Sequence, residues 1–338
     1  MIAATPTRQS DPATLLRQLT QPGAGDTNSE QKHADPTGER RARVEPAWPA
    51  LDPAALHGLA GDIVAALDPT TEADPVAVLV DFLVSFGSAV GRGAWLQVGH
   101  DRHGANLFAV LVGETSKARK GSSRGGVNHL MERADEVWTT SRVQGGLSSG
   151  EGLIWAVRDP IEKNEPVKEK GHVTGYQTVT VDPGVQDKRL LCIEEEFSAV
   201  LKQTIRQGNT VSETMRRAWD GRGVLATMTK NSPARATGAH VSILGHVTRD
   251  ELSRTLTDTE TANGLGNRFL WFAVRRSKVR AFLPRLTEAD AEELSDKVRT
   301  ALTFAADVGE VTLDSAARTV WEAVYPEVSK GAPASSGP

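Results

Sequence analysis

Two apolar segments near the start of the chain have helical spacing. Between residues 53 and 67 apolar side chains recur every three or four positions, which predicts an amphipathic helix. These side chains are Leu56, Leu59, Ile63 and Leu67. The next segment begins with Asp74 as a cap and Pro75 at the first helical position. Because it is apolar nearly all round, we expect its helix to be buried.

Runs of apolar and β-branched residues further along predict strands. The runs AWLQVG and NLFAVLVG flank the turn-rich HDRHGA, a pattern that predicts a hairpin. The run RLLCIEEEF (189–197) predicts a buried strand that ends in three carboxylates. Further strand candidates are VLATMTK, HVSILGHVT and NRFLWFAVRR.

Helical patterns separate these strands. SRGGVNHLMERADEVW predicts one helix of about four turns, and GGLSSGEGLIWAVRD predicts another with Ser148 or Ser149 as its cap. TEADAEELSDKVRTALTFAAD predicts a long helix near the end. Residues 159–188 are polar and broken by Pro and Gly, so we expect a surface insertion with at most a short hairpin around YQTVTV. Strands that alternate with helices predict an α/β sandwich with a central, mostly parallel sheet.

Composition divides the chain into a core and two tails. Residues 1–50 are polar with almost no aromatic residue, which predicts a disordered N-terminal tail, and residues 329–338 have the composition of a second one. Between the tails we expect a small helical lead-in over 51–98 and an α/β core over 99–284. C-terminal helices are predicted over 285–328.

Composition also narrows the class of protein. The apolar segment from Pro75 is interrupted by Asp81 and is shorter than the roughly 20 residues of a membrane span. The first residues have no basic segment followed by an apolar one, so we expect no secretory signal, a cytoplasmic protein and no membrane partner. Cys192 is the only cysteine, which excludes an intramolecular disulfide and a zinc site made of several thiolates.

The charge is uneven. The net charge of −4 argues against a uniformly basic nucleic-acid-binding surface. Between residues 198 and 280, however, fourteen Lys and Arg stand against six Asp and Glu, an excess of eight positive charges. This segment could face a polyanion, or it could form solvated helix surfaces.

The segment NLFAVLVGETSKARKGSS (106–123) has the parts of a phosphate-binding loop: a strand, a glycine, a lysine and hydroxyls at the next helix. The residues assigned to the phosphates are Gly113, Thr115, Lys117, Lys120, Gly121, Ser122 and Ser123. The spacing departs from GxxxxGK[ST], because Lys120 comes one residue late and Gly121 separates it from Ser122. A basic surface turn is therefore the alternative for the loop taken alone.

The three acids after the apolar run LLCI have the pattern of a Walker B strand. We expect Glu194, together with Ser122, to hold Mg²⁺, and Glu195 to polarise the attacking water. The first acid in this class is usually Asp, so the division of roles between the glutamates stays open. Solvated acids at the end of a strand are the alternative.

Other residues could complete such a site. His246, at the end of VSILGH, would contact the γ-phosphate from the neighbouring strand, although a core-edge histidine is an equal alternative. An arginine finger that acts on a neighbouring subunit's nucleotide could be Arg268, Arg275 or Arg276, and Arg268 is the assignment.

The turn-rich segment 220–240 carries three candidates for contact with nucleic-acid phosphates. They are Arg222, Lys230 and Arg235. A plain β-hairpin is the alternative for this segment.

Five segments in order make a more specific pattern: GETSKARKGSS, GLSSGEGLIWAVRD, LLCIEEEF, TKNSPARATGAHVSILGHVTRDEL and TANGLGNRFLWFAVRRSK. Together, over residues 52 to 328, they resemble a family of RecA-like P-loop ATPases from phages, plasmids and integrative elements. Members often occur beside or fused to primase-polymerase domains, and usually continue with a helical C-terminal region where this chain has SKGAPASSGP.

The resemblance implies a RecA-like P-loop NTPase sandwich and a replicative-helicase-like ATPase. ATP and Mg²⁺ would be its cofactors, a homo-oligomeric ring its assembly, and single-stranded DNA its partner, with any primase-polymerase in another chain. It implies the loop role for Lys120 and Ser122, the Walker B role for Glu194 and Glu195, and the sensor and finger roles for His246 and Arg268. Two alternatives are a nucleotide-binding scaffold without turnover and a defence or regulatory ATPase not coupled to DNA.

Overall fold

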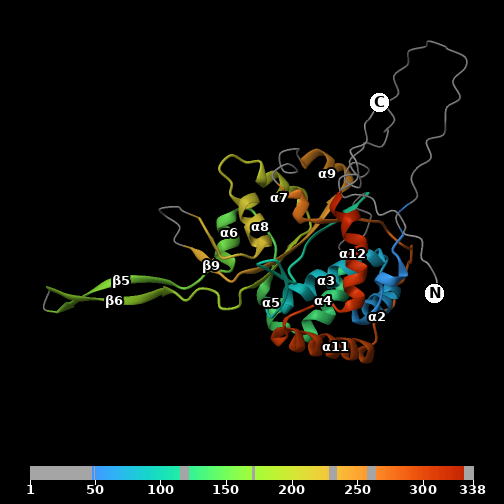
Figure 1. Ribbon diagram of the computed structural model, residues 1–338, viewed down its shortest axis with the longest axis horizontal. Helices are drawn as coiled ribbons and strands as arrows, with labels where there is room; N and C mark the ends of the chain where they lie inside the picture. Colours follow the sequence, from blue (N-terminus) through green and yellow to red (C-terminus); the bar gives the residue numbers. More distant parts are fainter. Residues whose placement is uncertain are drawn as a thin grey trace, which may run out of the picture.

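A five-stranded parallel sheet lies at the centre of the computed structural model, with helices on both faces (Figure 1). The structure describes residues 48, 50–114, 122–169, 172–227, 234–256 and 264–330. In spatial order the strands are β11 (Leu270–Val274), β3 (Phe108–Gly113), β10 (His240–Thr248), β7 (Arg189–Glu194) and β4 (Val143–Gln144). The predicted α/β sandwich with a parallel central sheet is confirmed.

The two faces of the sheet are covered by different helices. One layer contains α2 (Gly58–Leu67), α3 (Pro75–Val90), α4 (Ser122–Ala134), α5 (Glu136–Arg142) and α11 (Glu288–Asp307). The other contains α6 (Gly150–Ala156), α7 (Phe197–Thr204), α8 (Val211–Asp220) and α9 (Arg249–Thr255). We call these the α3 layer and the α7 layer.

Strand β3 contributes to both cores because successive side chains of a strand point to opposite faces. Phe108, Val110 and Val112 pack under the α7 layer. Ala109 and Leu111 pack under the α3 layer. Burial on both faces explains the uninterrupted apolar run in the sequence.

The predicted helical lead-in is part of the sandwich. Helix α3 packs against β3, β7, β10 and β11, so it covers the middle of the sheet. The boundary expected between residues 98 and 99 falls in the turn between β1 (Ala94–Val98) and β2 (Asp101–Gly104). A domain boundary there would divide a hairpin.

The hairpin expected from residues 94–113 is wrong in its pairing. Strand β1 pairs with β2 inside the segment read as a turn, and the short strand β12 (Gly309–Glu310) joins its other side. Strand β3 belongs to the central sheet instead. The reason is burial: the residues of β1 and β2 are only partly buried or exposed, whereas all of β3 is buried.

Capping residues set several helix starts, and Asp74 and Ser149 among them are as predicted. The side chains of Asp74, Ser149 and Thr287 accept backbone N–H groups at the starts of α3, α6 and α11. The single helix expected after the loop is two helices, because Asp135 accepts the Trp138 N–H at 3.0 Å and begins α5.

The insertion at 159–188 is a long two-stranded arm that projects from the body (Figure 1). Its strands are β5 (Ile161–Glu169) and β6 (His172–Asp182), so the expectation of at most a short hairpin is wrong. Most of its residues on both faces are exposed, and the apolar-polar alternation that usually reveals a strand is therefore weak. Arg158 holds the base through an ion pair with Asp182 at 2.9 Å.

The remaining elements lie outside the central sheet. The described part of VLATMTK, residues 224–227, contains β8 (Val224–Ala226), which pairs with β9 (Arg235–Thr237) in a separate hairpin. Helix α12 (Ser315–Lys330) ends the described chain. Residues 1–47 and 331–338, where tails are predicted, lie outside the described residues.

Candidate functional site

The predicted phosphate loop and the predicted Walker B acids leave the sheet at the same edge. All five strands are parallel, so Gly113 at the end of β3 and Glu194 at the end of β7 both lie at carboxyl ends. Strand β10 lies between them, which separates β3 from β7 by two strand spacings, about 10 Å. The sheet therefore places the start of the loop and the acids of β7 at the same edge.

The same edge has the geometry of a ligand crevice. Strand β3 comes first in the chain, and its connection crosses to β4 at one edge of the sheet. The chain then adds β7, β10 and β11 in the opposite direction, and the last connection passes β3. The helices of that first connection, α4 and α5, lie in the α3 layer, and those of the later connections lie in the α7 layer. The neighbouring strands β3 and β10 therefore connect to opposite layers, and open α/β sheets bind ligands outside the carboxyl ends at such a switch point.

The loop itself is described only at its two ends. Gly113 and Glu114 lie before it and Ser122 follows it, whereas Thr115, Lys117, Lys120 and Gly121 lie outside the described residues. Ser122 is exposed at the start of α4.

Ser123 does not share that exposure. Its side chain is buried, and its Oγ donates to the Asp81 carboxylate of α3 at 3.0 Å. Arg124 forms an ion pair with the same carboxylate at 3.2 Å. Ser123 thus fixes α4 on α3, and Ser122 is the described hydroxyl of the pair that is open to solvent.

Glu194 is buried and holds a neighbouring loop. Its Oε1 accepts the Leu147 N–H at 2.7 Å, which ties the end of β7 to the segment between β4 and α6. Burial raises the pKa of this carboxyl, and the N–H groups of Leu147 and Gly146 oppose the shift. Strand alternation directs Glu194 toward the α7 layer, since Ile193 packs on the α3 layer.

Glu195 has the opposite environment. It lies in the turn between β7 and α7, and its side chain is exposed, as is that of Glu196. The buried Phe197 directly follows the two acids. Its ring packs against β10 at Gly245, where an added Cβ would come within 2.6 Å of the ring. This contact fixes the turn that carries Glu195.

His246 lies on β10, between the loop strand and the acid strand, as predicted for a sensor position. It is level with Leu111 of β3 and is only 3% exposed. It follows Gly245 by one residue, and alternation therefore directs it to the α3 layer, the side on which α4 packs.

Arg268 lies at the other edge of the sheet. It ends the short helix η4 (Gly266–Arg268) directly before β11, so it is at the amino end of that strand. Its guanidinium forms an ion pair with Asp220 of α8 at 3.0 Å and donates to the Gly264 carbonyl at 3.1 Å. Within its own chain Arg268 is therefore remote from Glu194, and the role on a neighbouring subunit stays a prediction.

The other two finger candidates follow β11 at the carboxyl edge. The Arg275 N–H donates to Asp74 at 3.2 Å, and the Arg275 guanidinium lies 4.9 Å from the centre of the Trp48 ring. Arg276 pairs with the buried Glu72. These contacts bind the end of β11 to the segment that precedes α3.

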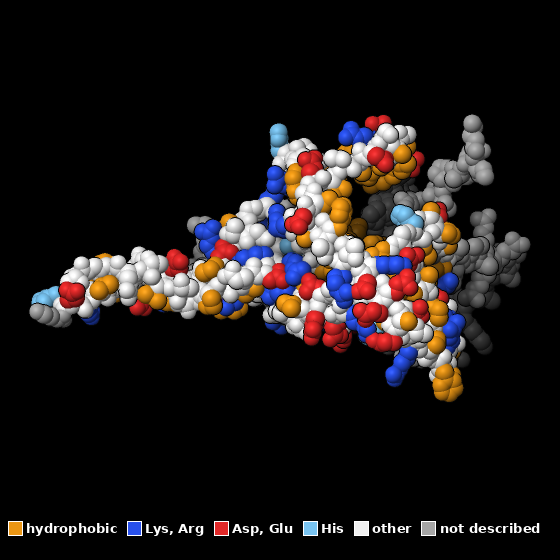
Figure 2. All heavy atoms as spheres, turned by 90° about the horizontal axis from the view of Figure 1, so that it is seen from below, with side chains coloured by type: hydrophobic (Ala, Val, Ile, Leu, Met, Phe, Trp, Pro, Cys, Tyr) orange, Lys and Arg blue, Asp and Glu red, His pale blue; other side chains and the backbone are white. Residues whose placement is uncertain are grey.

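The residues proposed to contact nucleic acid surround the β8–β9 hairpin. Arg222 pairs with Asp101, and Arg235 lies 3.6 Å from Asp159. Both arginine side chains are about two-thirds exposed, at 64% and 60%. Lys230 lies outside the described residues. Figure 2 shows basic and acidic side chains interspersed over the visible face.

Asp81 is the residue of this region that the sequence interpretation missed. In the sequence it only interrupts an apolar segment, yet it is fully buried and organises the start of α4. The signal was available, because an acid within an otherwise apolar helix must find a buried partner.

The acids at the carboxyl edge suit magnesium only in part. No group of three or more His, Cys, Asp or Glu that could hold a metal ion occurs in the described ranges. Carboxylate oxygens are nevertheless its preferred ligands, and Mg²⁺ is usually held by one or two carboxylates together with waters and phosphates. The oxygen donors of Glu194 and Ser122 match that chemistry, and their joint role in holding Mg²⁺ stays a prediction.

Comparison of the sequence with protein-family models and with curated proteins finds no match. Among the helices that the structure describes, none has the length and apolar character needed to cross a membrane.

Proposed function

We propose that the chain binds a nucleoside triphosphate at the carboxyl edge of the sheet and hydrolyses it with Mg²⁺. The observation that supports this most is the strand order β11, β3, β10, β7, β4. It brings the end of the loop strand and the acids of β7 to one edge, on either side of β10 with His246, where the neighbours β3 and β10 connect to opposite layers. The RecA-like P-loop class, implied by the five sequence segments, has the same combination of loop and acid strand.

In the proposed site each residue has one role. Lys120 would neutralise the β- and γ-phosphates, and the Ser122 hydroxyl and Glu194 would hold the metal. Glu195 orients the attacking water, and its exposure at the turn leaves the carboxylate open to solvent. Bound Mg²⁺ would offset negative charge on the phosphates. His246 would contact the γ-phosphate from between the two strands.

Release of phosphate by the purified full chain tests this proposal. Lys120→Ala should abolish both ATP binding and turnover. Glu195→Gln should retain binding and lower the rate by about 100-fold or more, the scale of a lost general base. Glu196→Gln is the matched control, since it removes the adjacent exposed acid at the same length and should leave the rate within about twofold.

Two results would count against the site. Turnover that survives Lys120→Ala would exclude the loop. Equal loss of binding and turnover in Glu195→Gln would give that residue a structural role. If the wild-type chain binds ATP but releases no phosphate, with or without single-stranded DNA, the scaffold alternative is favoured.

Coupling to DNA, and with it a helicase-like role, is the further part of the proposal. A motor predicts that single-stranded DNA stimulates phosphate release and that the stimulation weakens as salt rises, because the contacts are to phosphates. An unchanged rate at low salt would favour an ATPase not coupled to DNA.

A further inference from the structure

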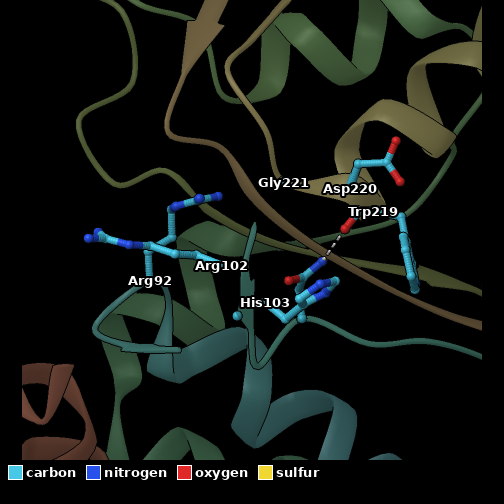
Figure 3. Close-up of a pocket in the computed structure, with 8 residues that line it drawn as sticks. Arg92, Arg102, His103, Trp219, Asp220 and Gly221 are labelled. Carbon is cyan, nitrogen blue, oxygen red and sulfur yellow. Dashed lines mark hydrogen bonds between the residues drawn. The ribbon is translucent and has the colours of Figure 1, made fainter. Parts of the chain in front are cut away.

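A hollow at the amino edge of the sheet is lined mainly by basic and polar groups. It lies between the β1–β2 hairpin and the end of α8 (Figure 3). Its lining residues are Arg92, Arg102, His103, Gly104, Asn106, Trp219, Asp220 and Gly221. A second hollow adjoins it and shares three of these residues, with Trp95 as an additional wall. Neither hollow belongs to the proposed nucleotide site.

Arg92 and Arg102 line both hollows, and Figure 3 shows them together on one side of the first. Among the residues that the structure describes, neither Arg92 nor Arg102 has a carboxylate within ion-pair distance. Arg92 donates one N–H to the Ala239 carbonyl at 3.1 Å. Burial, and the charge of Arg102, lower the pKa of Arg92. Two unpaired like charges held together repel, and a bound anion would relieve that repulsion.

The nearby acids are engaged with other arginines. Asp101 pairs with Arg222, and Asp220 pairs with Arg268 at 3.0 Å. Figure 3 shows the Asp220 carboxylate turned away from Arg92 and Arg102. The two aspartates therefore compensate Arg222 and Arg268. The positive charges of Arg92 and Arg102, which line the hollow, stay uncompensated.

The arginines are also oriented by their surroundings. The Arg102 guanidinium lies over the Trp95 ring, 4.1 Å from its centre. Stacking of this kind fixes the plane of the guanidinium and leaves the N–H groups at its edge free to donate. Guanidinium forks match the paired oxygens of phosphate groups. The cavity of about 40 Å³ has room for about three waters, a space comparable to a phosphate group.

We propose that this arginine hollow binds a phosphate group, presented either by the backbone of a single-stranded nucleic acid or by a small phosphate compound. Single-strand binders combine positive charge with aromatic rings on which bases stack. Trp95 and Trp219 flank the two arginines, and the exposed Arg222 follows Gly221. These neighbours extend the positive surface beyond one phosphate. The site does not depend on ATP binding at the other edge.

Binding of a fluorescein-labelled oligo(dT) to the full chain, followed by anisotropy over a range of salt, tests the nucleic-acid source. The background is Lys120→Ala, which removes the contribution of the nucleotide loop. Arg92→Gln and Arg102→Gln should each weaken binding by about tenfold. Each should also make the negative slope of log K against log salt shallower by about 0.7, the share of one phosphate contact. Arg318→Gln, an arginine on α12 outside the hollow, is the charge-matched control and should change neither quantity.

A second measurement covers the small-phosphate source. In the same Lys120→Ala background, inorganic phosphate, compared with chloride at equal ionic strength, should raise the melting temperature when Arg92 and Arg102 are present but not in Arg92→Gln/Arg102→Gln. Arg102 donates no hydrogen bond to a described residue, so Arg102→Gln alone keeps the test valid if Arg92→Gln fails to fold.

Loss of oligonucleotide binding in the double variant supports the nucleic-acid source, and loss of the phosphate effect alone supports a small phosphate compound. If the double variant matches Arg318→Gln in both measurements, the proposal is overturned. If Lys120→Ala loses ATP binding but keeps oligo(dT) binding, the two sites are separate.

Discussion

Acidification should destabilise the protein through His240, the first residue of β10. Its side chain is 2% exposed, and its Nε2 lies 2.8 Å from the Gly87 carbonyl of α3. Burial, reinforced by the charges of Arg92 and Arg189, lowers its pKa from 6.5 to about 4, while the Gly87 contact and Asp187 oppose the shift. Below its usual pKa this histidine therefore stays neutral in the folded state and takes up a proton in the unfolded chain.

The sign and size of this pH effect follow from the linkage between proton binding and folding. A lowered folded-state pKa contributes stability that is fully present above 6.5 and is lost as the pH falls toward about 4. The full shift of the His240 pKa from 6.5 to about 4 corresponds to about 3 kcal/mol in the free energy of unfolding. About 2 kcal/mol of this stability is lost by about pH 5.

Urea unfolding at about pH 7.5 and about pH 5 measures this loss. Wild type should lose about 2 kcal/mol more than His240→Gln, which cannot titrate but retains an N–H donor for Gly87. His100→Gln, at an exposed histidine in the β1–β2 turn, is the matched control and should behave as wild type. An equal loss in wild type and His240→Gln would refute the reasoning.

Two further predictions concern the supports of the candidate site. Gly245→Ala should lower the free energy of unfolding by about 1–3 kcal/mol, because its Cβ would lie 2.6 Å from the buried Phe197 ring. Gly125→Ala, at a helix position with open space around it, should instead raise that energy by about 0.5–1 kcal/mol in the same urea titration. Asp81→Ala should cost about 3 kcal/mol or more, since it leaves the Arg124 charge and the buried Ser123 hydroxyl without their shared acceptor. If the free energy of unfolding is unchanged in Asp81→Ala, the Asp81 carboxylate does not stabilise the start of α4.

The central sheet could be predicted because burial leaves a simple pattern in the sequence. Strands β3, β7 and β10 are buried on both faces; β3 and β7 therefore appear as apolar runs, and β10 as a mainly apolar, β-branched one. Strand β4 has only two residues and no such run, and it was missed. Its place is fixed by long-range pairing with Leu191 and Cys192 of β7, which local sequence does not encode.

The arm and the first hairpin fail for a related reason. Both carry mostly exposed side chains, so hydrophobicity does not separate strand from loop. In β2 the polar residues Asp101, Arg102 and His103 were read as a turn, yet they pair with β1. The polar residues therefore predicted a change of chain direction correctly, but not the pairing of β1 with β2.

The candidate site was predictable as motifs but not as contacts. The loop and the acids were found from residue type and order, and the parallel sheet places their strands at one edge. The side-chain partners could not be found in this way. Glu194 is engaged with the Leu147 N–H, and Ser123 with Asp81, because packing of α6 and α3 brings those distant segments against the edge.

The position of Arg268 bears on the assembly that the proposed ATPase would need. It precedes Leu270, which pairs with Ala109 near the start of β3, whereas the loop begins after Gly113 at the end of that strand. The two levels are about six residues apart along the strand direction, or about 20 Å. No side chain crosses that distance, so Arg268 can complete a nucleotide site only on another copy. In that arrangement the amino edge of one copy would face the carboxyl edge of the next. The arginine hollow, which contains the Arg268 partner Asp220, would then lie beside the contact between the copies.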